Sequence, residues 1–213
     1  MPSSRVARAP LAAIALIALV FSPTAIAAGP CAGGTNLLVN CSFDSNFGSW
    51  GTNGGIGNVT WVSTPDNSGG GGSIQLISDP GGNRTLYQCF LVSPSTSYGF
   101  GTFVFQTPDA CTAPQVGIRV LFYQQPTADC ATLNSSGTLS AITPFVDGPV
   151  STTTSSWVKI NSTASTPSDT NSIFFVMASY CSNSLVQAGT SYVDEAFFGQ
   201  GLTPVDLRSF SAD

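Results

Sequence analysis

Short segments of the chain alternate between apolar and polar side chains with a period of two residues. Such alternation is typical of a β-strand that buries only one face. The segment VGIRVLFYQ, residues 116–124, shows the pattern best. Its apolar positions are Val116, Ile118, Val120 and Phe122. The opposite face carries Arg119, Tyr123 and the following Gln125.

Six other segments have the same character. They are rich in Val, Ile, Phe, Tyr and Thr and are bounded by Gly, Pro, Asn, Asp and Ser, as strands usually are. No stretch after the N-terminal region repeats apolar residues with helical spacing. About eight to ten strands in one domain predict two packed sheets, an all-β sandwich or jelly roll. The six segments are Ser73–Ile77, Thr85–Val92, Tyr98–Gln106, Trp157–Thr163, Ser172–Tyr180 and Thr190–Phe198.

The N-terminus has the three parts of a cleavable secretory signal. Arg5 and Arg8 give a basic start, an uncharged apolar run follows from Ala9 to Phe21, and Ala25-Ile26-Ala27 supplies small residues for the peptidase. The apolar run is shorter than the roughly 20 residues that span a bilayer. We therefore expect a signal peptide over 1–27, a mature domain over 28–201, a C-terminal tail over 202–213, and no membrane insertion after cleavage.

The charge of the mature chain limits its partners. Cleavage leaves four basic and eleven acidic residues, a net charge of −7. The remaining cations are Arg84, Arg119, Lys159 and Arg208, and they are scattered along the chain. Nucleic acid binding depends on clustered Lys and Arg, so we expect neither nucleic acid nor an anionic membrane surface as a partner.

All six cysteines follow the predicted cleavage site. An even number in an exported chain predicts three disulfides, for which 15 connectivities exist. No C-x-x-C spacing occurs and the chain has no histidine, which argues against a zinc site. The cysteines are Cys31, Cys41, Cys89, Cys111, Cys130 and Cys181.

Four segments, taken in order, resemble the galactose-binding-like jelly roll of CenC-type carbohydrate-binding modules. The resemblance covers about Asn36 to Gly199, and the order and spacing of the segments carry it. An asparagine-led opening precedes a Gly-x-Trp, a Pro-containing hairpin leads to a tyrosine, and a tryptophan-led strand precedes an acidic final strand. The segments are 36–44 (NLLVNCSFD) with 48–50 (GSW), 72–76 (GSIQL) with 88–98 (QCFLVSPSTSY), 157–160 (WVKI) and 192–196 (YVDEA).

The resemblance implies a structural calcium ion that ties the opening strand to the final strand. Asp44 and Asp194 match the family's carboxylates by position, and Asp66 lies in the loop that would supply a third ligand. This chain departs from the family pattern, with Asp44 in place of Glu and Asp194-Glu195 in place of Asp-Asp. Calcium takes six to eight oxygen ligands. The competing interpretation is that these are ordinary turn and strand-end acids.

The same topology implies a disulfide pairing. If the strands 116–124 and 172–180 run antiparallel side by side, Cys111 and Cys181 lie at the same end. Cys130 then remains for Cys89, and Cys31 remains for the nearby Cys41.

Sugar recognition needs a flat aromatic ring and planar polar groups. Arg119, Tyr123 and Gln125 would offer both if their strand face is the concave side of the jelly roll, with Trp50 and Trp61 contributing from neighbouring edges. Aromatic residues in a sandwich are equally well explained as core. The sequence therefore predicts a secreted domain that binds a polysaccharide or glycan. Periplasmic and cell-surface locations stay open, as does a structural or adhesive role in which the same fold contacts another surface protein.

Catalysis has little support in the sequence. Without histidine, neither a Ser-His-Asp nor a Cys-His arrangement can form. Hydrolysis of a glycosidic bond needs two carboxyl groups that flank it. Asp194 and Glu195 are adjacent on a predicted strand and are expected to point to opposite faces, so we expect no enzyme.

Overall fold

The computed structural model describes residues 36–53, 58–67, 71–78, 84–108, 111, 114–135, 141–181 and 189–201. The predicted signal peptide, Cys31 and the tail 202–213 lie outside these residues. The described elements are β1 (Gly51–Asn53), β2 (Val59–Val62), β3 (Ser73–Ser78), β4 (Arg84–Leu91), β5 (Ser97–Gln106), β6 (Pro114–Tyr123), α1 (Cys130–Ser135), β7 (Ala141–Ser151), β8 (Val158–Ser165), β9 (Ser172–Cys181) and β10 (Gly189–Gly199).

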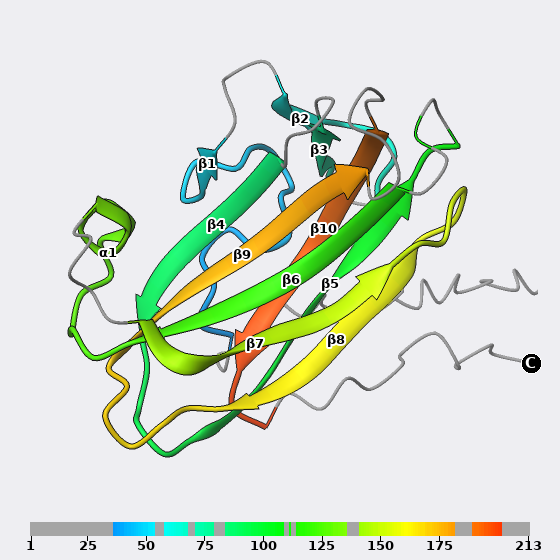
Figure 1. Ribbon diagram of the computed structural model, residues 1–213. Helices are drawn as coiled ribbons and strands as arrows, with labels where there is room; N and C mark the ends of the chain where they lie inside the picture. The colour runs from blue at the N-terminus through cyan, green and yellow to red at the C-terminus, as the bar shows by residue number, and fades with distance from the viewer. Residues whose placement is uncertain are drawn as a thin grey trace, which may run out of the picture.

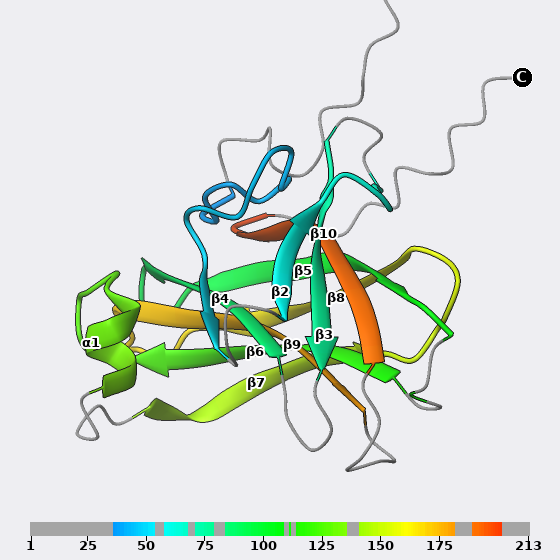
Figure 2. The same cartoon turned by 90° about the horizontal axis from the view of Figure 1, so that it is seen from above.

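The strands form two antiparallel five-stranded sheets that pack face to face (Figures 1 and 2). The front sheet of Figure 1 has the order β1-β4-β9-β6-β7, and the back sheet has the order β2-β3-β10-β5-β8. Apart from the pairs β6–β7 and β2–β3, the neighbours in both sheets are not consecutive in the chain, as in a jelly roll. The isolated bridge between Asn36 and Gly199 joins the start of the described chain to the end of β10.

All seven strands predicted from alternation are present. The structure adds β1, β2 and β7, which the sequence pattern did not reveal. β1 and β2 are three and four residues long, too short for alternation to stand out. β7 contains Pro144, Gly148 and Pro149, residues that usually interrupt strands. β7 therefore forms an edge strand of the front sheet, although the local propensity of its residues predicts a loop.

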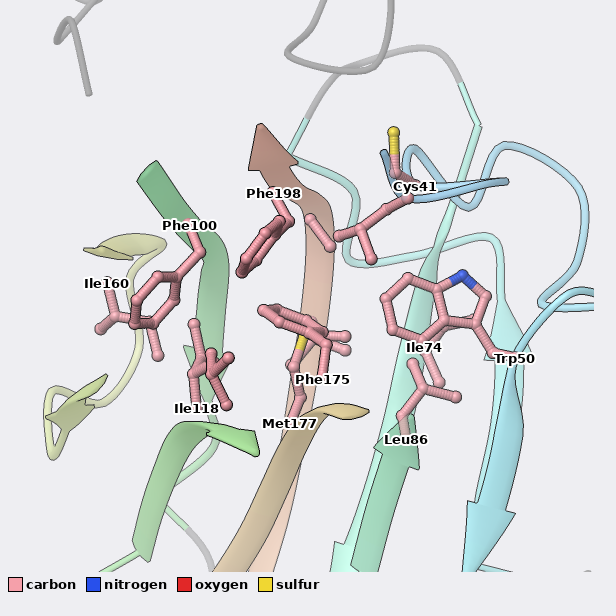
Figure 3. Packing of buried hydrophobic residues seen from close by; sticks show 14 of the residues in the cluster. Cys41, Trp50, Ile74, Leu86, Phe100, Ile118, Ile160, Phe175, Met177 and Phe198 are labelled. Carbon is pink, nitrogen blue, oxygen red and sulfur yellow. The ribbon is translucent and has the colours of Figure 1, made fainter. Parts of the chain in front are cut away.

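Aromatic side chains fill the space between the sheets (Figure 3). The ring of Phe198 lies within 5.0 Å of Phe90, 5.1 Å of Tyr98 and 6.1 Å of Phe175, measured between centroids. Trp50 closes one side of this cluster against Phe175 at 6.1 Å. The predicted apolar face of β6 points into the same core and is fully buried. Burial of this area is the main stabilising term of the fold.

Two disulfides agree with the predicted pairing. Cys111 bonds Cys181 and Cys89 bonds Cys130, with Cα–Cα distances of 5.8 and 5.4 Å. The first pair lies where β6 and β9 run antiparallel, because Pro114 is in register with Cys181. Cys41 is also disulfide-bonded. Its predicted partner, Cys31, lies outside the described residues.

The short helix α1 was not expected. Asp129 caps it by accepting a hydrogen bond from the backbone N–H of Ala131 at 3.0 Å. The Cys89–Cys130 bond ties its first residue to β4, and Leu133 packs against the front sheet. Among the described residues no helix is long and apolar enough to cross a membrane.

One end of the core is polar. Gln106 at the end of β5 is fully buried, and neither its amide oxygen nor its amide nitrogen has a hydrogen-bond partner among the described residues. Ser191, opposite it in β10, bonds Ser179 instead, at 3.1 Å between hydroxyl oxygens. A buried amide without partners costs free energy that an apolar side chain of similar volume does not.

We predict that Gln106→Met raises the free energy of unfolding by about 1 kcal/mol, because it removes two unsatisfied buried polar atoms. Urea denaturation followed by tryptophan fluorescence measures the change. Gln200→Met is the control, since Gln200 is exposed and its replacement leaves stability unchanged. A loss of stability in Gln106→Met would show that the amide is satisfied in solution and would contradict this account.

Candidate functional site

The outer face of the front sheet carries a row of residues that crosses four strands. The register places Arg119 of β6 opposite Val176 of β9, Val176 opposite Tyr87 of β4, and Tyr87 opposite Gly51 of β1. Arg119 is exposed, and Tyr87 and Val176 are half-buried. All four residues point away from the core because side chains alternate along each strand.

The ring of Tyr87 extends from β4 over Gly51 of β1. A Cβ atom built on Gly51 would lie 2.2 Å from Cε2 of Tyr87 and 2.8 Å from its hydroxyl oxygen, so the ring extends over the bare backbone of β1. On the other side the ring stacks on Phe174, with centroids 4.9 Å apart and planes inclined by 27°. Its hydroxyl makes no hydrogen bond within the described part of the chain. The Tyr87 ring is therefore held in place, and its hydroxyl group is left to bond a ligand.

The end of this face nearest α1 is closed by apolar packing. Tyr123, Phe174 and Leu133 of α1 form a small buried cluster together with Cys89. Tyr123 is 7% exposed, and burial raises the pKa of its hydroxyl. Tyr87 and Val176 of the row pack against this cluster and are half-buried, whereas Arg119 is exposed.

Arg119, Tyr123 and Gln125, the three residues predicted for this surface, differ in exposure and in position. Arg119 lies exposed on the outer face. Tyr123 shares that face but is buried by α1, which the sequence did not reveal. Gln125 is exposed beyond the end of β6, where its carbonyl accepts a hydrogen bond from the hydroxyl of Ser172. Sequence reasoning missed Tyr87, although the alternation in 85–92 already sets it on the face opposite the buried Leu86.

The two tryptophans expected at the edges of this face pack inward. Trp50 is 6% exposed, and its indole N–H donates to the carbonyl of Asn40 at 3.1 Å. Trp61 is half-buried against the same core and donates to the carbonyl of Phe43 at 2.6 Å. Trp50 is buried and its ring packs against Phe43 and Phe175, so its expected role at the ligand surface is wrong. Both tryptophan rings are stabilised by burial against the core and not by a position on the outer face.

The carboxyl groups of Asp194 and Glu195 lie on the same side of the molecule, contrary to the expectation from simple alternation. β10 has a bulge between Asp194 and Phe197, and Glu195 adopts a φ of 48°. Asn67 consequently donates to both groups, from its backbone N–H to Asp194 at 3.0 Å and from its side-chain amide to Glu195 at 2.6 Å. A bulge places two consecutive side chains outside the usual alternation.

These two carboxyl groups are also buried. Asp194 is fully buried and Glu195 is 8% exposed. Burial raises the pKa of Asp194 to about 7. Backbone N–H groups of Asn67 and Glu195 oppose the rise, and the charges of Glu195 and Asp66 add to it. The burial leaves no open face on which this pair could flank a substrate bond.

The predicted calcium ligands are only partly brought together. Asp66 lies close enough to raise the pKa of Asp194, and it accepts a hydrogen bond from the backbone N–H of Gly71 at 3.1 Å. Asp44 touches the other side of Gly71, whose built Cβ would lie 2.8 Å from an Asp44 carboxylate oxygen. Asp44 itself is exposed and accepts from the hydroxyl of Ser42. Among the described residues, no three acidic or cysteine side chains form a metal-binding group.

We predict that stability without divalent cations falls as the pH rises from about 4 to about 7. Within this window folded Asp194 holds a proton that the unfolded chain has released, because its pKa is raised from 3.8 to about 7. One such proton gives a slope of about 1.4 kcal/mol per pH unit. Below this window both states are protonated and above it both are ionised, so the contribution to the slope disappears.

Asp194→Asn tests this assignment by urea denaturation at several pH values in the presence of a chelator. The amide keeps an acceptor for the N–H of Asn67 but cannot titrate, so the slope between pH 4 and 7 should flatten. Asp169→Asn, at an exposed turn, is the control and should keep the wild-type slope. An unchanged slope in Asp194→Asn would assign the pH dependence to other groups.

Comparison with known proteins gives matches in structure alone. No protein-family model matches the chain, and no curated protein matches its sequence. TmCBM61, solved in complex with beta-1,4-galactotriose, is 14% identical with a TM-score of 0.51, covering 78% of this chain and 98% of that one. The C-terminal family 22 carbohydrate-binding module of Clostridium thermocellum Xyn10B is 15% identical with a TM-score of 0.55, covering 81% and 99%. A family 16 carbohydrate-binding module is 18% identical with a TM-score of 0.51, covering 78% and 100%.

At this level of identity the likeness establishes the fold and not the ligand. Each of these modules is covered almost completely, so the similarity extends over an entire domain. It confirms the architecture that the opening, hairpin and closing motifs of the sequence indicated. The chain has a jelly-roll β-sandwich fold similar to that of these carbohydrate-binding modules.

Proposed function

We propose that this protein is a non-catalytic carbohydrate-binding domain, and that it binds a glycan on the outer face of the front sheet. The observation that carries the proposal is the position of Tyr87. Its ring is fixed by Phe174 on one side and extends over Gly51 on the other. A ring held in this way can stack on the apolar face of a sugar without losing side-chain entropy on binding.

Arg119 supplies the polar part of the same surface. It is exposed two strands from Tyr87 in the same row. Its planar guanidinium has five N–H donors, which suit the hydroxyl oxygens of a sugar. Recognition then combines one aromatic ring with one planar donor group on a rigid sheet.

Several features support a binding role outside the cytoplasm over an enzymatic one. The chain has no histidine, and its buried carboxylate pair is closed to substrates. Disulfides persist mainly in oxidising compartments, which fits the predicted export. Structural neighbours solved with beta-1,4-galactotriose and with xylohexaose indicate the first ligands to test.

We predict that Tyr87→Ala lowers the affinity for a bound oligosaccharide at least about thirtyfold, as expected for the loss of about 2 kcal/mol at an aromatic hot spot. Isothermal titration calorimetry with xylohexaose and with β-1,4-galactotriose, preceded by a screen of soluble polysaccharides, measures the change. Tyr87→Phe is the matched control and should retain most of the affinity, because it keeps the ring.

Gly51→Val provides a second variant that leaves Tyr87 itself intact. Its side chain would occupy the space of the tyrosine ring and displace it, so binding should also weaken. Circular dichroism verifies that each variant is folded. Full affinity in both Tyr87→Ala and Gly51→Val would reject this face. Failure of the wild-type protein to bind any polysaccharide, together with concentration-dependent self-association, would favour the adhesive role.

The proposal includes a structural calcium ion near Asp66 and Asp194. Asp66, Asp194 and Glu195 concentrate negative charge at the bulge of β10, and a divalent cation would relieve their repulsion. We predict that adding calcium to chelator-treated protein raises the midpoint of thermal unfolding, and that Asp194→Asn abolishes this rise. An unchanged midpoint in the wild-type protein would reject the ion.

A further inference from the structure

The outer face of the back sheet also carries a continuous row of residues. Each strand of the sheet contributes one residue to it, except that the last residue directly precedes β8. Thr60 of β2 is in register with Gln75 of β3, Gln75 with Tyr192 of β10, and Tyr192 with Phe105 of β5. Trp157 directly precedes β8, whose first residue, Val158, pairs with Val104 of β5. Trp157 therefore lies beside Phe105 and continues the row. All five side chains are half-buried. With strands about 4.8 Å apart, the row is about 19 Å long.

Direct contacts link the residues of this row from end to end. The hydroxyl of Thr60 donates to the amide oxygen of Gln75 at 3.1 Å, and the amide nitrogen of Gln75 donates to the hydroxyl oxygen of Tyr192 at 3.1 Å. The ring of Phe105 then lies 6.0 Å from Tyr192 and 5.6 Å from Trp157, between centroids. The contacts fix the orientation of the amide and the three rings before any ligand arrives.

Trp157 differs from the other two tryptophans in how it uses its indole N–H. Trp50 and Trp61 donate theirs to backbone carbonyls of the same molecule. Trp157 makes no hydrogen bond within the described residues. The Tyr192 hydroxyl likewise accepts a bond from Gln75 without donating one to any described residue. Half-buried aromatic rings with unused donors suit a ligand that offers both apolar faces and hydroxyl oxygens.

The charge around the row favours an uncharged ligand. Arg84, Arg119 and Lys159 are the cationic side chains of the described residues. Arg84 is buried and Arg119 lies on the front sheet. Lys159 is on the back sheet, where its ammonium lies 5.8 Å from the ring of Phe103 and 5.2 Å from that of Phe197. The row itself contains no ionisable acid or base other than the tyrosine.

We propose that the row Thr60–Gln75–Tyr192–Phe105–Trp157 is a second glycan-binding surface, on the face of the sandwich opposite Tyr87. The proposal rests on the proposed function, because it assigns the same class of ligand to a separate site. A neutral oligosaccharide lies across the strands, with its apolar faces against Phe105 and Trp157 and its hydroxyls bonded to Trp157, Tyr192 and Gln75. A domain with binding surfaces on both outer faces (Figure 2) joins two polysaccharide chains instead of only attaching to one.

The test is the number of oligosaccharides bound per protein, measured by isothermal titration calorimetry with xylohexaose and β-1,4-galactotriose. We expect two for the wild-type protein and one for Tyr87→Ala. Trp157→Phe retains a ring beside Phe105 and removes only the indole donor, and it should weaken the second site at least tenfold. Trp157→Ala should abolish it. Thr163→Ala, exposed on β8 away from the row, is the matched control.

Combining the variants separates this proposal from the proposed function. Binding that survives Tyr87→Ala and is lost in Tyr87→Ala/Trp157→Ala supports the second surface. If Tyr87→Ala removes all binding while Trp157→Ala changes neither stoichiometry nor affinity, the second surface is rejected and the front site stands. If Trp157→Ala instead abolishes self-association in analytical ultracentrifugation without affecting glycan binding, the row is a protein contact and the proposal is wrong. No binding of any probe by the wild-type protein rejects both.

Discussion

Aromatic packing between the two sheets is the constraint on which the rest of this structure depends. Phe198, Phe175 and Trp50 occupy the space between the layers with ring contacts of about 5–6 Å. Each strand can turn only alternate residues into that space. Once these rings are buried, the alternation fixes which residues face outward. The outer rows that contain Tyr87 and Trp157 are therefore consequences of the core, and shifting one strand by a single residue would disrupt the row of the sheet to which it belongs.

The bulge in β10 interrupts the alternation of inward and outward side chains. It allows Asp194 and Glu195 to meet the single loop residue Asn67. The free-energy cost is visible in the pKa of Asp194, which burial raises to about 7. A divalent cation bound beside Asp194 would offset this cost by favouring the ionised carboxylate.

Both outer faces combine aromatic rings with hydrogen-bonding groups, but the elements around them differ. On the front sheet, α1 and the Cys89–Cys130 disulfide close one end, and a single tyrosine ring is held over Gly51. On the back sheet, rings and polar groups are joined in one line by direct contacts.

Local pattern determined much of this protein. Period-two alternation in seven segments predicted the strands, and the number of strands together with the motif order predicted the sandwich. The even cysteine count predicted disulfides, and the topology implied by the resemblance predicted the observed Cys111–Cys181 and Cys89–Cys130 bonds. These features depend on neighbours in sequence or on a topology that the motifs identify. Tertiary structure alone decided that Trp50 is core, that α1 buries Tyr123, and that Tyr87 meets Gly51. The physical reason is that exposure is a property of what packs over a residue, and the covering elements come from distant parts of the chain.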